Sequence, residues 1–395
     1  MNNKVLLAFS GGLDTSFCVK YLKHEQQLEV HTAFINTGGF TKDELSDIEK
    51  KALSLGSVSH LNIDETAVFY NKGIRYLIYG NILKGQTYPL SVSAERVFQA
   101  VALIEYAKKI KADYIAHGST GAGNDQVRFD LVFQVLAPEI KIITPVRSLK
   151  ISRQEEIDYL QKHGYEYPWE KAKYSINQGL WGTSVGGVET LTAGGELPEE
   201  AFPTPCTKRD TGKITIQFEK GEPVGINGEK MSPIEVIQKL NSIAAPYAIG
   251  RDIHVGDTII GIKGRVGFEA AAPLIIIKAH HLLEKHVLTK WQQYWKEMIA
   301  NWYGMMLHEA QYLDPVMRNM ETFMESTQMY VTGNVNVKLQ PYHYAVIGCE
   351  SDYDLMNSKF GDYGEVNKAF TGEDVKVFTT ILANQMKIFY ATHEK

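Results

Sequence analysis

The chain contains only three cysteines among 395 residues, Cys18, Cys206 and Cys349, and no CxxC pair. This scarcity argues against a disulfide framework or a structural zinc site and predicts a protein of the reducing cytoplasm. Long apolar runs are also absent, because the longest, Ala270 to Ile277, is interrupted by Pro273. A membrane-spanning helix needs roughly 20 apolar residues, so we expect no membrane span and no membrane partner.

An excess of basic charge is missing as well. The chain has 41 Lys and Arg against 46 Asp and Glu, a formal net charge of −5 at pH 7. Proteins that bind nucleic acid usually carry a basic surface, so this balance removes nucleic acid as a default partner. The apolar content of 44% lies in the globular range, which excludes a disordered chain.

The first 165 residues alternate between short apolar strands and helical segments. Strands are predicted at Val5–Phe9, Val30–Asn36, Val58–Ile63, Tyr114–Ala116 and Ile140–Ile143, and helices at Asp14–Leu22, Lys42–Leu55, Ser93–Ile110 and Ser152–His163. We expect Ser93 and Ser152 to cap the starts of their helices. Strands that alternate with helices indicate parallel pairing with crossover connections. The predicted fold class is therefore α/β, with a doubly wound parallel sheet forming a nucleotide-binding domain over residues 1–165.

After residue 165 the pattern changes to that of a larger α+β domain, predicted over residues 166–365, and a final helical segment over 366–395. Strands are predicted at Ile214–Phe218, Pro223–Ile226, Thr327–Lys338 and His343–Cys349, and helices at Ser232–Leu240, Leu282–Met306 and Lys376–Thr392. The first two strands should form an antiparallel hairpin. The apolar residues of the last helix suit docking onto another subunit.

Two features of the long predicted helix could be taken for functional sites. Trp291, Trp295 and Trp302 mark one helix face, which we expect to lie in the core or in a subunit interface. His280 and His281 are expected to follow a strand and to begin the helix, with Glu284 one turn beyond His280. A metal pair is geometrically possible there, but we interpret these residues as structural.

The sharpest local signal is a glycine-containing segment between the first strand and the first helix. It reads Ala8, Phe9, Ser10, Gly11, Gly12, Leu13, Asp14, Thr15, Ser16. The two glycines let the backbone turn and present N–H groups, three hydroxyls add donors, and the helix start adds positive potential, so the segment suits phosphate. The chain has no GxxxxGK[ST] motif and no GxGxxG motif.

A second polar segment, His117 to Asp130, follows the strand at Tyr114–Ala116 and reads HGSTGAGNDQVRFD. It places a hydroxyl, an amide, a carboxylate and a guanidinium within nine positions, on Thr120, Asn124, Asp125 and Arg128. The planar fork of an arginine suits a carboxylate. Such a cluster can hold an amino acid by its two charged ends, although the segment alone would also fit an ordinary polar loop.

These two segments carry a family resemblance. AFSGGLDTS resembles the SGGxD[ST]S loop of the ATP pyrophosphatase (PP-loop) group, and HGSTGAGNDQVRFD is similar to the HG-[AS]-TGKGNDQVRFE segment of the argininosuccinate synthase family. Both stand in the family's order and spacing, with Tyr88-Pro-Leu-Ser-Val-Ser93 between them. The resemblance spans about Val5 to His280. It implies an adenine nucleotide α hydrolase-like domain, a synthetase domain that also serves multimerisation, and a homotetramer.

The resemblance also implies a reaction. Members of this family are carbon–nitrogen ligases of arginine biosynthesis that join citrulline and aspartate into argininosuccinate, using ATP with Mg²⁺. The ureido oxygen of citrulline attacks the α-phosphate, pyrophosphate leaves, and the amine of aspartate displaces AMP from the citrullyl-adenylate. Positioning and charge neutralisation carry such catalysis, and no enzyme nucleophile is needed.

Site residues follow from the positions that match the family's motifs. The resemblance assigns ATP to Ala8 through Ser16 together with Ile35 and Gly118. It assigns aspartate to Thr120, Asn124 and Asp125. It assigns citrulline to Tyr88, Ser93, Asn124, Arg128, Ser175, Ser184, Gly256 and Phe268. Asp14, Asp125 and Arg128 are the expected catalytic residues, and no side chain is expected to form a metal site.

Four departures from the family's pattern concern charge. Ala122 replaces a usual lysine, Gly256 stands where a glutamate usually meets the α-ammonium of citrulline, and Phe268 replaces a tyrosine. The segment from Val185 to Glu189 also has glycines where a glutamate is usual. Either Asp257 or Glu189 replaces the missing carboxylate, or the true substrate is an N-acylated citrulline. Another adenylating PP-loop enzyme and a nucleotide-binding regulator are the remaining alternatives.

Overall fold

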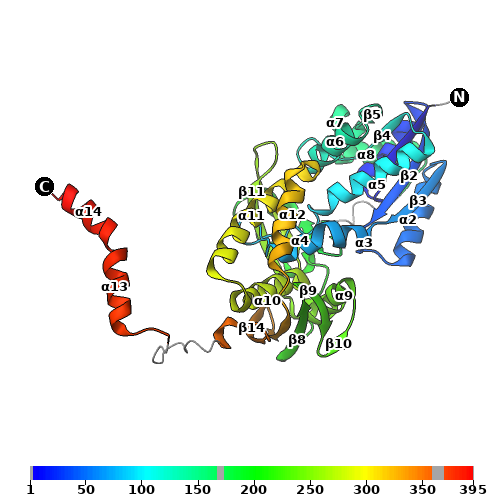
Figure 1. Cartoon of the computed structure of the whole chain (residues 1–395). Helices are drawn as coiled ribbons and strands as arrows, with labels where there is room; N and C mark the ends of the chain where they lie inside the picture. The colour runs from blue at the N-terminus through cyan, green and yellow to red at the C-terminus, as the bar shows by residue number, and fades with distance from the viewer. Residues whose placement is uncertain (1–2, 167–172, 358–368, 395) are drawn as a thin grey trace.

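The computed structural model describes residues 3–166, 173–357 and 369–394. Its N-terminal part is built on a parallel sheet of order β3-β2-β1-β4-β5 (Figure 1). The strands are β1 (Lys4–Ala8), β2 (Glu29–Asn36), β3 (Ser59–Asp64), β4 (Tyr114–Ala116) and β5 (Lys141–Ile143). The predicted doubly wound parallel sheet is confirmed.

Helices cover both faces of this sheet because successive residues of its strands point to opposite sides. Val5 and Leu7 of β1 pack with one group of helices, which are α1 (Leu13–His24), α2 (Lys42–Ser54), α7 (Pro145–Leu149) and α8 (Arg153–Lys162). Cys18 is fully buried in this layer. Leu6 faces the other layer, formed by α5 (Glu95–Ile110) and α6 (Asp125–Leu136).

Two further sheets follow in the chain. A four-stranded antiparallel sheet of order β11-β12-β7-β6 is formed by β6 (Ser175–Gly179), β7 (Gly182–Gly186), β11 (Arg251–Asp257) and β12 (Lys263–Glu269). The other sheet, of order β10-β9-β8-β13-β14, is formed by β8 (Gly212–Glu219), β9 (Glu222–Ile226), β10 (Glu229–Lys230), β13 (Gly333–Gln340) and β14 (His343–Glu350). The predicted hairpin is the β8–β9 pair.

The remaining helices pack between and around these sheets. They are α3 (Thr66–Phe69), a π-helical turn (Tyr70–Ile74), α4 (Arg75–Tyr79), α9 (Pro233–Ala244), α10 (Ala271–Val287), α11 (Lys290–His308) and α12 (Val316–Thr327). Short 3₁₀ turns lie at Val188–Leu191, Glu199–Ala201, Ala245–Tyr247, Gln311–Leu313 and Leu355–Asn357. No helix in the described part of the chain is both long and apolar enough to cross a membrane.

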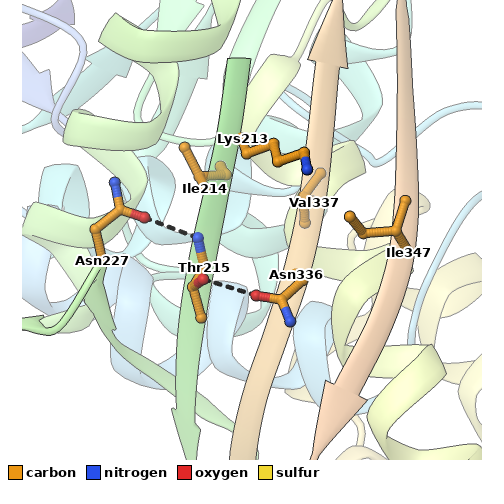
Figure 2. Close-up of a pocket in the computed structure, with 7 residues that line it drawn as sticks. All are labelled: Lys213, Ile214, Thr215, Asn227, Asn336, Val337 and Ile347. Atoms are coloured by element: carbon orange, nitrogen blue, oxygen red, sulfur yellow. Dashed lines mark hydrogen bonds between the residues drawn. The ribbon is translucent and has the colours of Figure 1, made fainter. Parts of the chain in front are cut away.

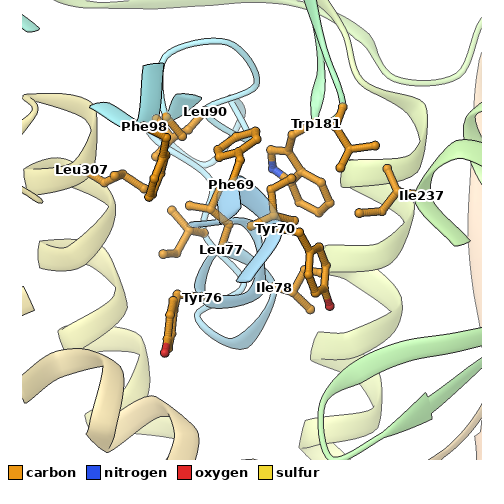
Figure 3. Packing of buried hydrophobic residues seen from close by; sticks show 14 of the residues in the cluster. Phe69, Tyr70, Tyr76, Leu77, Ile78, Leu90, Phe98, Trp181, Ile237 and Leu307 are labelled. Atoms are coloured by element: carbon orange, nitrogen blue, oxygen red, sulfur yellow. The ribbon is translucent and has the colours of Figure 1, made fainter. Parts of the chain in front are cut away.

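One core joins the two halves of the molecule. Figure 3 shows Phe69 and Leu77 from the α3–α4 region meeting Phe98 of α5, Leu307 of α11 and Trp181 from the β6–β7 turn. The indole of Trp181 is fully buried, and its Nε1 donates a hydrogen bond of 2.9 Å to the carbonyl of Pro89. This contact fixes the β6–β7 hairpin against the loop that carries Tyr88.

The predicted long helix over residues 282–306 is wrong. The chain instead forms α10, which begins at Ala271, and α11, which begins after the cap residue Thr289. Thr289 and Gln292 make a reciprocal capping box, which starts a new helix. His280 therefore lies inside α10, where it contacts Asn81, Gln328 and Glu284 in a buried structural network. No cluster of three metal-ligating side chains occurs among the described residues.

The expected core position of the tryptophan face is also wrong. Trp291, Trp295 and Trp302 are 66%, 58% and 62% exposed. The other half of the interpretation, that this face lies in a subunit interface, stays a prediction. Ser152 caps α8 as predicted, but Ser93 does not cap α5, whose N-terminal flanking residue is Ala94 without a side-chain bond.

Two predicted elements near the end of the chain have different bounds. The strand predicted at 327–338 begins only at Gly333, because Thr327 still belongs to α12. The single terminal helix is two helices, α13 (Gly372–Leu382) and α14 (Asn384–His393), which lie apart from the rest of the molecule in Figure 1. None of their residues is buried. The predicted domain boundary between residues 365 and 366 lies outside the described residues.

Candidate active site

The predicted phosphate segment lies at the carboxyl edge of the parallel sheet, between β1 and α1. Strand order reverses between β1 and β4, and ligands of open α/β sheets bind at such a switch point. Gly11 adopts a positive φ of 76°, and Gly12 flanks α1 without a side-chain cap. The first N–H groups of α1 thus remain available to an anion. The backbone at Gly118 passes so close that a Cβ there would lie 3.2 Å from the Asp14 carbonyl carbon.

The hydroxyls of this segment are organised by its own backbone. The Ser16 hydroxyl donates to the Gly12 carbonyl at 2.7 Å, and the Ser10 and Thr15 hydroxyls lie 3.3 Å apart. Ile35 lies near the end of the neighbouring strand β2 and is buried. The structure therefore brings the predicted ATP residues together at one edge, from β1, α1, β2 and the loop after β4.

Lys51 of α2 reaches the same segment, although sequence reasoning did not single it out. Its Nζ lies 2.6 Å from the Gly11 carbonyl oxygen. Burial lowers the pKa of Lys51 to about 8. The sequence held no distinguishing signal for it, because Lys51 is one of several lysines along an amphipathic helix.

Asp14 has an unexpected partner behind the phosphate segment. Its carboxyl group lies next to that of Glu156 on α8, whose side chain is almost fully buried. Burial, followed by the charge of Asp14, raises the pKa of Glu156 to about 8. Two neighbouring carboxyl groups disfavour each other's ionisation, so the pair holds one proton near neutral pH.

The second polar segment begins helix α6 and is held by arginines. Asp125 accepts a bond of 2.9 Å from Arg96 Nε and one of 2.8 Å from Arg128 Nη1. Burial opposes ionisation of Asp125, but the charges of the two arginines outweigh it and lower its pKa to about 2. Arg96 also donates to Glu95 at 2.8 Å. Asp125 is therefore a fixed anion, and Arg96 is a site residue that sequence reasoning missed.

Asn124 and Arg128 connect this segment to the second half of the chain. The Asn124 side-chain oxygen accepts a bond of 2.8 Å from the backbone N–H of Ile259, in the β11–β12 turn. Arg128 Nε donates to the carbonyl of His308 at the end of α11, at 2.9 Å. Thr120 lies in the preceding loop. The predicted aspartate and citrulline residues of this segment thus face residues far away in the sequence.

The remaining predicted citrulline residues meet on one face of the β11-β12-β7-β6 sheet. Ser184 of β7 lies directly across from Phe268 of β12 and, on its other side, across from Asn177 of β6. Ser175 is two residues before Asn177, so its side chain lies on the same face of the sheet. Gly256 lies on this face as well, since β11 and β12 pair in regular register. We call this surface the serine face.

Tyr88 covers the serine face. Its ring centroid lies 5.4 Å from that of Phe268 and 5.1 Å from that of His254, which stacks on it with an interplanar angle of 20°. Ser93 follows in the same loop and is buried, and its Oγ has no hydrogen-bond partner. His308 Nδ1 is likewise buried and unpartnered. Unpaired buried polar atoms usually mark the place of a ligand or an ordered water.

The two carboxylates considered as replacements at the α-nitrogen do not lie on the serine face. Asp257 is exposed and pairs with Lys263 at 2.6 Å. Glu189 accepts a bond of 3.3 Å from Tyr174, whose ring packs with Val185 on the opposite face. Sequence reasoning could not see this, because the side on which a loop residue folds back is a tertiary property.

A shallow groove of about 330 Å³ elsewhere in the molecule is not part of this arrangement. Figure 2 shows it on the β8–β13–β14 surface, where Thr215 donates to Asn336 at 2.7 Å and its N–H donates to Asn227 at 2.8 Å. These polar groups satisfy one another, and none of the predicted site residues lines the groove.

A parallel sheet with a lysine-free phosphate segment at its switch point, close to a loop that carries an arginine-held carboxylate, is typical of a nucleotide-binding domain of the ATP pyrophosphatase class. Comparison with known families agrees. The arginosuccinate synthase N-terminal HUP domain matches residues 4–166, and the arginosuccinate synthase C-terminal domain matches residues 174–389. The chain belongs to the argininosuccinate synthase family, which confirms the resemblance and the predicted fold class.

Relatives of this name are similar over nearly the whole chain. The argininosuccinate synthase of Sulfurisphaera tokodaii is 37% identical over 364 residues, 92% of this chain and 93% of that protein. That of Methanocaldococcus jannaschii is 36% identical over 92% of this chain and 93% of that protein. That of Dictyoglomus thermophilum is 37% identical over 98% of this chain and 97% of that protein. An NH3-dependent NAD synthetase structure from Campylobacter jejuni covers 44% of this chain and 69% of that one, with 15% identity and a TM-score of 0.29.

Proposed function

We propose that this chain ligates the ureido carbon of a citrulline substrate to the amine of aspartate, with cleavage of ATP to AMP and pyrophosphate. The observation that carries the proposal is the meeting of three parts at one place. The loop after β4 passes against the phosphate segment at Gly118 and leads into Asn124 and the arginine-held Asp125, and Asn124 is bonded to the β11–β12 turn at 2.8 Å. Argininosuccinate is the product of such a ligation, and the pathway we infer is arginine biosynthesis.

The first step in this mechanism is transfer of AMP. The ureido oxygen attacks the α-phosphorus, the bond to the β-phosphate oxygen breaks, and pyrophosphate leaves. The N–H groups at the start of α1 and the Ser10 hydroxyl are assigned to the leaving phosphates, with Lys51 beside them. A loop without its own P-loop lysine suits an enzyme that releases pyrophosphate. The Gly118 backbone is assigned to the nucleotide, and Ile35 to the adenine.

The second step is displacement of AMP. The aspartate amine attacks the activated carbon, a C–N bond forms, the C–O bond to AMP breaks, and the amine loses a proton to solvent. Thr120, Asn124 and Asp125 are assigned to aspartate. Because its low pKa keeps Asp125 ionised, it can hold the ammonium form of the incoming substrate. Arg128 is assigned to the α-carboxylate of the citrulline substrate.

Magnesium enters this proposal with ATP. The hydroxyls of Ser10, Thr15 and Ser16 are oxygen donors of the kind that Mg²⁺ accepts, so the phosphate segment fits an ion that is bound mainly through the phosphates. No larger cluster of metal-ligating side chains occurs in the described ranges. When bound, the ion would neutralise phosphate charge.

We also infer a homotetramer in the cytoplasm. Val377, Ile381, Ile388 and Phe389 on α13 and α14 are each more than half exposed. An apolar surface of this kind is typical of a segment that docks onto another subunit. The three cysteines are free thiols, which supports a reducing compartment.

Pyrophosphate release tests the proposed function. We expect release from ATP only when aspartate and a citrulline substrate are both present, with AMP formed in equal amount. Asp125→Asn should lower kcat/KM for aspartate by about 100-fold, since a hydrogen bond to a charged group contributes about 1.5–3 kcal/mol. Asp113→Asn is the control, because the Asp113 side chain accepts from the Lys4 N–H just before β4, at the opposite end of that strand from the site. Release without aspartate would favour another adenylating enzyme, and no release with any citrulline would favour a nucleotide-binding regulator.

A further inference from the structure

We propose that the groups around the serine face, which include Arg128, Lys84 and His254, select a citrulline whose α-nitrogen is acylated and therefore uncharged. The inference rests on the proposed ligation and concerns only the amino-acid end of that substrate. It assigns His254 and Gly256 as the residues that determine specificity at the α-nitrogen.

His254 occupies the serine face at a fixed position. It lies across from Val266 and is two residues from Gly256 on the same side of β11. Its imidazole stacks on Tyr88, and its side chain is 8% exposed. A Cβ at Gly256 would lie 2.5 Å from His254 Nε2, and one at Gly85 would lie 3.5 Å from His254 Cε1. The imidazole therefore fills the space into which a side chain at position 256 would extend.

Cationic and neutral groups surround this position. Burial lowers the pKa of His308 to about 2, and the positive charges of Arg128 and Lys84 act in the same direction. Both cations therefore lie close to this histidine. Burial also lowers the pKa of His254, and the charge of Lys84 adds to this effect. Both imidazoles are thus neutral near pH 7, and Arg128 and Lys84 supply the positive charge.

The carboxylates of this sheet lie mainly on its other face. Glu269 follows Phe268 in β12, so it points to the opposite side, where it accepts from Arg251 at 3.1 Å. Asp257 is paired with Lys263, and Glu189 accepts from Tyr174 through one oxygen, while its other oxygen is buried without a hydrogen-bond partner on the face opposite the serine face. Asp252 shares the serine face by register, but it is exposed and accepts from the N–H of Ile253 at 2.7 Å.

The carboxylates that reach the pocket from other elements are also occupied. Arg96 binds both Asp125 and Glu95. Glu309, whose charge acts on Lys84, accepts from Gln311 at 3.1 Å. No carboxylate of the described residues is both directed at the serine face and without a partner of its own.

An α-ammonium bound here would meet like charge. If Arg128 binds the α-carboxylate, the α-nitrogen is bonded to the adjacent carbon and lies beside the same cations. A partly buried ammonium needs a carboxylate or several acceptors, and like charges repel strongly at low dielectric constant. An acylated nitrogen carries no charge. Its carbonyl can accept a bond from Lys84 or the His254 ring.

Steady-state kinetics with citrulline, N-acetylcitrulline and N-succinylcitrulline tests this inference, with ATP and aspartate saturating. We expect kcat/KM for at least one acyl derivative to exceed that for citrulline by at least tenfold. A kcat/KM for citrulline equal to or above both derivatives overturns the inference but supports the ligation. Failure of all three substrates to release pyrophosphate overturns the proposed function, and the inference with it.

A pair of variants links the preference to these residues. His254→Ala with Gly256→Glu removes the imidazole and places a carboxylate on the serine face. The ratio of kcat/KM for citrulline to that for the preferred acyl derivative should rise at least tenfold. Val255→Glu is the matched control, because it adds the same charge one residue away on the opposite face, where Val255 is 59% exposed. An unchanged ratio in the double variant, with turnover retained, overturns the assignment of His254 and Gly256.

Discussion

Replacing Glu156 with glutamine is expected to stabilise the protein at pH 8 and to have much less effect at pH 5. Glu156 and Asp14 share one proton in the native structure, and the pKa of Glu156 is raised from 4.5 to about 8, first by burial and then by Asp14. A raised carboxyl pKa contributes its stability fully below the unfolded value, and this contribution is lost as the pH rises toward 8. The side-chain amide that Glu156→Gln introduces would donate to ionised Asp14 without needing a proton.

The size of the effect follows from the same shift. Between pH 5 and pH 8 the native state binds almost one proton more than the unfolded chain. At about 1.4 kcal/mol per pH unit, the wild-type protein loses about 3 kcal/mol of stability relative to Glu156→Gln over this interval. At roughly 2–4 °C per kcal/mol, the difference between the two melting temperatures should grow by roughly 6–12 °C.

Thermal unfolding of both proteins at pH 5, 6.5 and 8 is the measurement. Glu155→Gln is the control on the same helix, since exposed Glu155 accepts from the Ser152 cap and its pKa is lowered by that cap. Its effect should be the same at pH 5 and pH 8, because Glu155 is ionised throughout. If the melting-temperature difference for Glu156→Gln is independent of pH, the shared proton between Asp14 and Glu156 does not exist.

Two other predictions concern the nucleotide and the assembly. Lys51→Met should raise KM for ATP about tenfold, or about 1.4 kcal/mol, and leave KM for aspartate unchanged in initial-rate kinetics. Burial lowers the Lys51 pKa to about 8, so Lys51 loses its positive charge between pH 7 and pH 9. KM for ATP should therefore rise over this interval in the wild type but not in the variant. Equal pH profiles for the two proteins would refute this. A chain that ends at residue 357, without α13 and α14, should have a smaller mass than the full chain by size-exclusion chromatography with light scattering, and an unchanged tetramer would rule out their role in assembly.

Much of the fold was predictable because its signals are local. The strands β1, β2 and β4 are short apolar runs, and each is followed by a helix-start pattern, so parallel pairing followed directly. The break between α10 and α11 was missed even though Thr289 and Gln292 have the three-residue spacing of a capping box. The strong apolar periodicity on both sides of this break hid a cap that was present in the sequence.

The candidate site divides in the same way. The phosphate segment and the Asn124–Arg128 cluster are contiguous, so their residue types alone indicated phosphate and amino-acid binding. The serine face is not contiguous, because it combines β6, β7, β11 and β12 with the loop of Tyr88. Without the family resemblance, Ser175 and Ser184 could not have been distinguished from other loop serines.

The sequence by itself determined the class of fold, the position of the phosphate segment and the absence of a carboxylate at position 256. Only the tertiary structure decided that His254 fills the adjacent space, that Glu189 folds to the other face, and that Glu156 lies against Asp14. The physical reason is that charge and hydrogen-bonding capacity belong to each residue type. The distances, burial and choice of sheet face that turn them into specificity or a pKa shift arise only when distant segments pack together.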